Sequence, residues 1–86
     1  MNLRGNCITP NENLKLPKFL KELNLSLNNI YLYGDLILPN FLEKLNMIDN
    51  NILEVKNWKL PNSLRILKLK NNRIIKVENW KLPDSL

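Results

Sequence analysis

The dipeptide Leu-Pro recurs every 22 residues, which constrains the fold more than any other feature of the sequence. A fixed period of this length indicates stacked structural units, each too small to bury its own apolar face. We therefore expect residues 1–86 to form a single repeat array. Its full repeats are residues 16–37, 38–59 and 60–81, and its partial repeats are residues 1–15 and 82–86.

Apolar residues occupy the same columns in each repeat. Three columns follow the Leu-Pro pair: Leu20, Leu42 and Leu64; then Leu23, Leu45 and Leu67; then Leu25, Met47 and Leu69. Along the chain, the apolar residues of the last two columns alternate with polar ones. This is the period-2 pattern of a strand with one buried face. One such strand per repeat, always in the same direction, predicts a short parallel β-sheet along one wall.

An asparagine column follows the strand leucines and contains Asn6, Asn28, Asn50 and Asn72. A turn at this point leaves backbone groups pointing into a core that water does not reach. A carboxamide has both donors and an acceptor with which to satisfy such groups. The column therefore predicts a structural asparagine ladder.

The return path of each repeat is too short for a full helix, and it contains a proline that is confined to bends. We expect 3₁₀ or irregular segments there, with Trp58 and Trp80 stacked in a periodic core column. The string LPxxLxxLxLxxNxI resembles the leucine-rich repeat, and its apolar positions are similar to the class typified by a protein phosphatase-1 regulator. The Leu-Pro-x-Ser-Leu opening at Leu60 is also similar to FNIP-type repeats of slime moulds and amoeba-infecting giant viruses. This resemblance implies an α/β solenoid with its sheet on the concave side.

The composition of the chain gives little support for an enzymatic function. The chain has no histidine, and its two glycines, Gly5 and Gly34, cannot form a phosphate-binding loop. Cysteines and carboxylates do not recur at metal-ligand spacing, so we expect no catalytic, cofactor or metal site. With one cysteine, no apolar run near 20 residues and no signal-peptide pattern, a cytoplasmic protein is expected, in the host cytoplasm if the source is viral.

Binding is the remaining class of function, and the repeat geometry indicates where it occurs. Side chains between the strand leucines face outward from the concave wall, and because they vary between repeats they would carry the specificity for a protein partner. The predicted protein-binding residues are Glu22, Asn24, Ser26, Lys44, Asn46, Ile48, Ile66, Lys68 and Lys70.

Positive charge is concentrated in the last full repeat. Residues 60–81 contain six basic residues against one acidic residue, which equals the net charge of +5 of the whole chain. A basic patch attracts acidic protein surfaces or nucleic acid. We favour an acidic protein, because the basic residues dominate one repeat only and the aromatic residues occupy core columns, where they cannot stack on bases.

The alternative is a structural role without a separate ligand. Neither end of the sequence carries a polar capping unit, since residues 1–8 begin in a strand segment and the sequence stops at Leu86, a core column. The chain would then self-associate through its uncapped ends, or be a fragment of a longer repeat protein. A wall of about 300 Å² is also small beside the roughly 800 Å² per partner of a standard interface.

Overall fold

The fold was obtained as a computed structural model that describes residues 1–7, 16–30, 38–56 and 60–78. These residues contain five strands of three residues each and no helix. The strands are β1 (Glu22–Asn24), β2 (Lys44–Asn46), β3 (Glu54–Lys56), β4 (Ile66–Lys68) and β5 (Lys76–Glu78).

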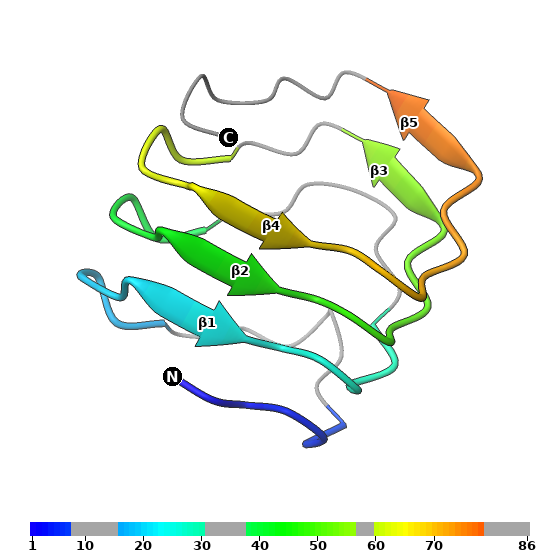
Figure 1. Ribbon diagram of the computed structural model, residues 1–86, viewed down its shortest axis with the longest axis horizontal. Coiled ribbons are helices and arrows are strands. Elements are labelled where there is room, and N and C mark those ends of the chain that lie inside the picture. Colours follow the sequence, from blue (N-terminus) through cyan, green and yellow to red (C-terminus); the bar gives the residue numbers. More distant parts are fainter. Residues whose placement is uncertain (8–15, 31–37, 57–59, 79–86) are drawn as a thin grey trace.

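The first sheet has the order β1-β2-β4, and its strands are parallel (Figure 1). Glu22 pairs with Lys44 and Lys44 pairs with Ile66, so each strand lies beside the strand that follows 22 residues later. Asn2 forms an isolated parallel bridge to Asn24, which continues the same spacing to the first residues of the chain. The predicted parallel sheet and its 22-residue register are therefore confirmed.

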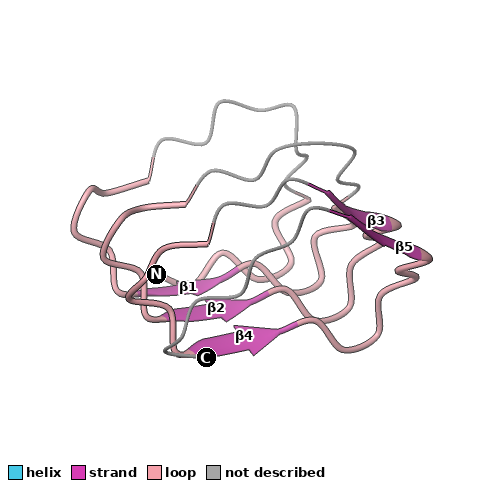
Figure 2. Cartoon of the chain, turned by 90° about the horizontal axis from the view of Figure 1, so that it is seen from above, coloured by secondary structure: helices cyan, strands magenta, loops and turns pink. Residues whose placement is uncertain are grey.

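A second sheet lies apart from the first and consists of β3 and β5, also parallel (Figure 2). The prediction of irregular or 3₁₀ structure on the return path is wrong for these two segments. Their central residues, Val55 and Val77, are β-branched and lie between charged residues, a composition that suits a strand. The other return segments, 31–37, 57–59 and 79–86, lie outside the described residues, and so do Trp58 and Trp80.

The hydrophobic core includes most members of the predicted apolar columns, whereas Leu20, Leu67 and Leu69 are only partly buried and pack against it. Leu23, Leu25, Leu45 and Met47 are buried on the inner side of the first sheet, together with Ile30, Leu38, Leu42, Ile52 and Leu64. The Leu-Pro segments enter this core through a tight turn in each repeat. The N–H of Leu42 donates to the carbonyl of Pro39 at 3.2 Å, and the N–H of Leu64 donates to that of Pro61 at 3.0 Å.

The asparagine ladder consists of Asn28 and Asn50, which are buried, and Asn72, which is half-buried, and it ties successive repeats together. The Nδ2 of Asn50 donates to the carbonyls of Leu25 and Met47, each at 3.0 Å, and these carbonyls belong to two different repeats. Its Oδ1 accepts from the backbone N–H groups of Asn28 and Ile30, each at 3.0 Å. Both ends of one carboxamide are therefore used, and each end reaches into the preceding repeat.

The other members of the column follow the same pattern. Asn72 donates to the carbonyls of Met47 and Leu69 at 2.9 Å, and its Oδ1 accepts from the N–H of Ile52 at 3.1 Å. Asn28 donates to the carbonyls of Leu3 and Leu25. Asn6, the first residue of the column, is exposed, and its backbone N–H donates to Asn28 Oδ1 at 2.8 Å.

The turn after each strand of the first sheet contains a residue in the left-handed region of backbone space. The four equivalent residues are Gly5, Leu27, Asp49 and Asn71, with φ between 57° and 70°. Glycine, asparagine and aspartate adopt this conformation more readily than leucine, whose Cβ approaches the following carbonyl oxygen. Leu27 therefore stores strain, and because its side chain is 45% exposed it gains only part of the packing energy of a core leucine.

Replacement of Leu27 by asparagine should stabilise the chain by about 1 kcal/mol, because asparagine relieves the left-handed strain. Thermal unfolding followed by circular dichroism should show a rise in Tm of about 4–8 °C for a domain of this size. Leu27→Ala is the matched control, since it removes the same side chain but keeps a strained residue. Equal Tm values for the two variants would contradict the backbone explanation.

Replacement of Asn50 by aspartate should destabilise the fold by more than about 3 kcal/mol, because a buried carboxylate would face the carbonyls that now accept from Nδ2. Urea denaturation measures this loss. Asn40→Asp adds the same charge at an exposed position and should change the free energy of unfolding by less than about 0.5 kcal/mol. A well-folded Asn50→Asp chain would show that the ladder is dispensable.

Candidate functional site

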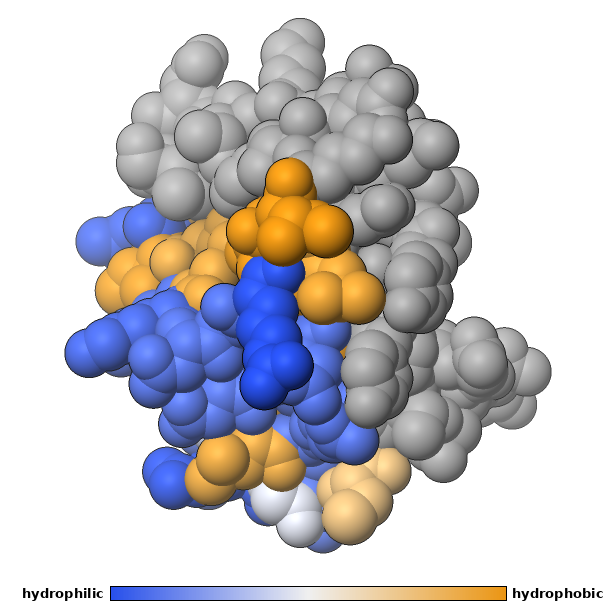
Figure 3. All heavy atoms as spheres, turned by 90° about the vertical axis from the view of Figure 1, so that its right-hand side faces the viewer, coloured by the Kyte–Doolittle hydropathy of each residue, from blue (hydrophilic) through white to orange (hydrophobic). Residues whose placement is uncertain are grey.

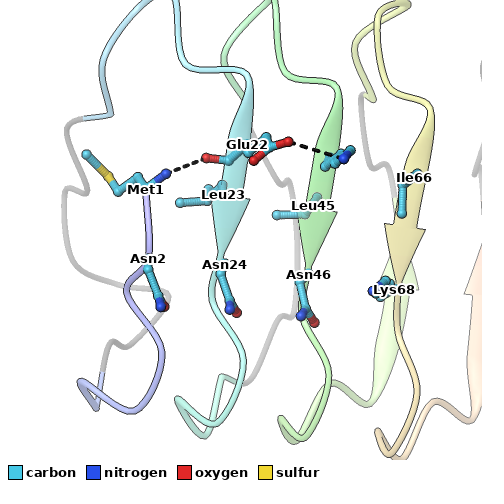
Figure 4. A pocket seen from close by; sticks show the side chains of 10 residues that line it. Met1, Asn2, Glu22, Leu23, Asn24, Leu45, Asn46, Ile66 and Lys68 are labelled. Carbon is cyan, nitrogen blue, oxygen red and sulfur yellow. Dashed lines mark hydrogen bonds and ion pairs between the residues drawn. The ribbon is translucent and has the colours of Figure 1, made fainter.

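The outer side of the first sheet carries an open depression of about 320 Å³ (Figure 4). We call this surface the strand face and define it by the six predicted binding residues that line the depression: Glu22, Asn24, Lys44, Asn46, Ile66 and Lys68. Met1, Asn2, Leu23 and Leu45 complete the lining. The structure thus brings together the residues of β1, β2 and β4 that alternate with the core leucines, because neighbouring strands share one register.

The other three predicted residues do not line the depression. Ser26 was expected to face outward, but it is only 4% exposed, and its Oγ donates to Asn24 Oδ1 at 2.7 Å. The chain has already left β1 at this point and enters the turn, so the strand alternation no longer applies. Ile48 is half-buried, and Lys70 is exposed beyond the end of β4.

The first row of the strand face consists of Glu22, Lys44 and Ile66. Lys44 Nζ lies 3.2 Å from Glu22 Oε1, and both side chains are mostly exposed, so this ion pair adds little stability. Its main effect is to neutralise the two charges locally. Ile66 is 39% exposed and provides the apolar part of the row.

The second row, which we call the carboxamide row, consists of Asn2, Asn24 and Asn46. Each Oδ1 accepts from the backbone N–H two residues later at 3.0 Å, and the donors are Arg4, Ser26 and Ile48. This bond fixes the side chains in one orientation, and Figure 4 shows them parallel to one another. Within the described ranges, their Nδ2 groups donate to no protein acceptor. Lys68 occupies the equivalent position on β4.

Lys68 lines the β4 end of the strand face, and two further cations, Arg65 and Lys70, flank β4 in the sequence. Arg65, Lys68 and Lys70 are exposed, and the Glu22–Lys44 contact is the one ion pair found in the described part of the chain. The positive charge of these three residues is therefore not neutralised by a neighbouring carboxylate in that part. This end of the face favours an anionic partner.

An exposed aromatic pair, Phe19 and Phe41, lies on the turns that precede β1 and β2. The ring centroids are 5.4 Å apart, and the two side chains are 69% and 48% exposed. Lys18 Nζ lies 5.8 Å from the Phe19 centroid. The expectation that aromatic residues occupy core columns is wrong for these two. Their exposure could have been predicted from the repeat column that they share with Ser63 of the third repeat. A polar residue at this position indicates that the position need not be buried.

The face formed by the turns after the strands is a weaker site. Figure 3 shows hydrophilic side chains gathered across its described part, beside hydrophobic areas. Its polar groups satisfy one another: Asn71 Nδ2 donates to Asp49 Oδ1 at 2.8 Å, and Asn51 donates to Asn29. Ile75 is also exposed, but it does not line the depression.

The described residues contain no group of three or more His, Cys, Asp or Glu placed to hold a metal ion. They also include no helix that is long and apolar enough to cross a membrane.

Comparison with protein-family models, curated proteins and solved structures finds no match for this chain. The resemblance to leucine-rich repeats therefore stays a prediction from the residue columns. The function is therefore inferred from the geometry of the strand face.

Proposed function

We propose that the chain is a non-catalytic protein-interaction module of the leucine-rich repeat type, with the strand face as its binding surface. Its repeats would stack as a solenoid, with the first sheet on the concave side. The register supports this arrangement, because every strand pairing joins residues 22 positions apart, in both sheets.

The main support for the proposal is that the two sides of the first sheet carry different kinds of residue. The inner side contains the repeating leucines, which are buried and serve stability. The outer side contains side chains that differ from strand to strand, from the Glu22–Lys44 pair to Ile66 and Lys68, and these line one depression. Residues that vary over a constant scaffold are free to determine specificity.

The partner is an acidic protein surface. The unneutralised charge of Lys68 lies at one end of the strand face, and those of Arg65 and Lys70 lie on residues that flank β4. Nucleic-acid binding would require basic and aromatic side chains in one groove. Here the aromatic pair belongs to the first two full repeats, whereas these cations belong to the third.

The aromatic pair extends the binding surface beyond the sheet. A flat wall of about 300 Å² is too small for a stable interface. Phe19 and Phe41 lie on the turns that lead into β1 and β2, three residues before Glu22 and Lys44 in the sequence. Exposed aromatic side chains are frequent anchors of protein interfaces, so these rings would supply the missing apolar contact.

The absence of histidine from the chain supports a non-catalytic role. The single cysteine, Cys7, is free and exposed, which fits a reducing compartment such as the cytoplasm.

The double variant Lys68→Glu, Lys70→Glu should lose an acidic partner without unfolding, because both lysines are exposed and reversed charges would repel that partner. Proteins captured by the immobilised chain are identified by mass spectrometry, purified and titrated by calorimetry against each variant. Arg4→Glu, Lys21→Glu is the matched control, with the same change of charge away from the β4 end. Lys18 is left unchanged because its Nζ contacts the Phe19 ring. Equal affinities for both double variants would contradict a role for the basic end.

The double variant Phe19→Ser, Phe41→Ser should bind the same purified partner at least tenfold more weakly, since each lost aromatic anchor typically costs more than about 1 kcal/mol. Serine is the residue at the equivalent position 63, so the fold already accommodates it. Circular dichroism should therefore show an unchanged spectrum. If neither this variant nor the lysine variant changes binding, the partner binds elsewhere and the proposed surface is wrong. If the immobilised chain captures no protein at all, the alternative of a structural repeat without its own ligand is favoured.

A further inference from the structure

We infer that the carboxamide row, continued by Lys68, recognises the carboxylates of an extended acidic peptide segment that lies across the strands. This inference rests on the proposed function, because it names the chemistry by which the strand face would bind its protein partner. The observation behind it is a row of carboxamides whose Oδ1 atoms each accept a hydrogen bond within the protein, whereas no donation by their Nδ2 groups is found among the described residues.

The acceptors of the row are already used within the protein. The Oδ1 atoms of Asn24 and Asn46 accept from the N–H groups of Ser26 and Ile48. The carbonyl oxygens of Asn24, Asn46 and Lys68 accept from the N–H groups of Leu3, Leu25 and Met47 at 2.8 to 2.9 Å. What remains for a ligand is the Nδ2 of each asparagine and the Nζ of Lys68.

A surface of this kind selects a ligand that only accepts hydrogen bonds. An ionised carboxylate has two acceptor oxygens and no donor, and hydrogen bonds to a charged acceptor are stronger than those between neutral groups. Lys68 adds a positive charge at one end of the row. The single carboxylate among the lining residues, Glu22, lies 3.2 Å from Lys44 Nζ, so its repulsion of an acidic ligand is reduced.

The spacing of the row indicates the length of the ligand. Neighbouring strands lie about 4.8 Å apart, so the three steps from Asn2 to Lys68 span roughly 14 Å. An extended peptide rises about 3.3 Å per residue, so a segment of four or five residues covers the row. It would run perpendicular to β1, β2 and β4 along the depression (Figure 4).

The donors are held in place before the ligand arrives. Each carboxamide is oriented by its bond to the backbone two residues later, and neighbouring side chains are parallel. Ordering of side chains on binding costs free energy, and preorganised groups avoid most of that cost. A short acidic segment therefore needs few contacts to bind.

Fluorescence anisotropy with a fluorescein-labelled penta-glutamate peptide tests the inference. The variants Asn24→Asp and Asn46→Asp keep the oxygen that accepts from Ser26 or Ile48, so the Tm should change little, but each loses the Nδ2 donor. Binding should weaken about tenfold or more in each variant, the expected effect of losing a hydrogen bond to a charged group. Asn40→Asp adds the same charge outside the row and should bind as the unmodified chain does.

A second pair of variants tests whether the change of charge alone explains the weaker binding. Lys68→Asn and Lys68→Met both remove the ammonium group, but Lys68→Asn places a fourth carboxamide in the row. The asparagine variant should bind penta-glutamate several-fold more tightly than the methionine variant. Equal affinities of these two variants would overturn a donor role at this position.

The outcomes separate this inference from the proposed function. Loss of peptide binding in Lys68→Glu, Lys70→Glu together with full binding in both Asn→Asp variants would overturn the inference and leave the basic end as the binding surface. No binding of penta-glutamate by the unmodified chain, or tighter binding of a thymidine oligonucleotide, would also overturn it. The captured protein partner described above tests the proposed function independently of the peptide.

Discussion

The fold depends on one side-chain group, the carboxamide of the asparagine ladder. Neighbouring repeats must bring their turns together in the interior, where unpaired backbone carbonyls and N–H groups would each cost free energy. Asn50 meets this requirement with both ends of its side chain, by donating to Leu25 and Met47 and accepting from Asn28 and Ile30. No apolar residue of similar size offers both functions, and so the leucine columns can pack only where this ladder is present.

The ladder also fixes the register of the strand face. Because each rung connects residues of consecutive repeats, Glu22, Lys44 and Ile66 are held at equivalent positions of adjacent strands. The same constraint aligns Asn24 with Asn46 and Lys68. Buried residues therefore determine which exposed residues are neighbours, and a binding surface is formed from three segments that are distant in the sequence.

The repeat columns were sufficient to predict the parallel sheet, the leucine core and the position of the asparagine ladder, because each depends on a pattern that recurs at a fixed period. Features specific to one repeat or to a few residues were not predictable in the same way. The segment Glu54–Lys56 is too short for its alternation to distinguish a strand from an irregular bend, and its pairing with Lys76–Glu78 requires a neighbouring repeat. Ser26 follows β1 directly, and its burial depends on where the chain turns. Phe19 and Phe41 share a column with Ser63, so composition alone left their exposure undetermined.

Asparagine recurs at several columns of this chain, and two of these columns show that the same residue type can have different chemistry. In the buried column the Nδ2 of Asn50 donates to backbone carbonyls and nothing remains for a ligand. In the outer column Asn46 accepts from the N–H of Ile48 through its oxygen, and the residue lines the depression. The difference arises from the local direction of the backbone, which presents carbonyls to one side chain and an N–H group to the other. The same residue type thus holds the repeats together on one side of the sheet and, by our inference, offers a partner its hydrogen-bond donors on the other.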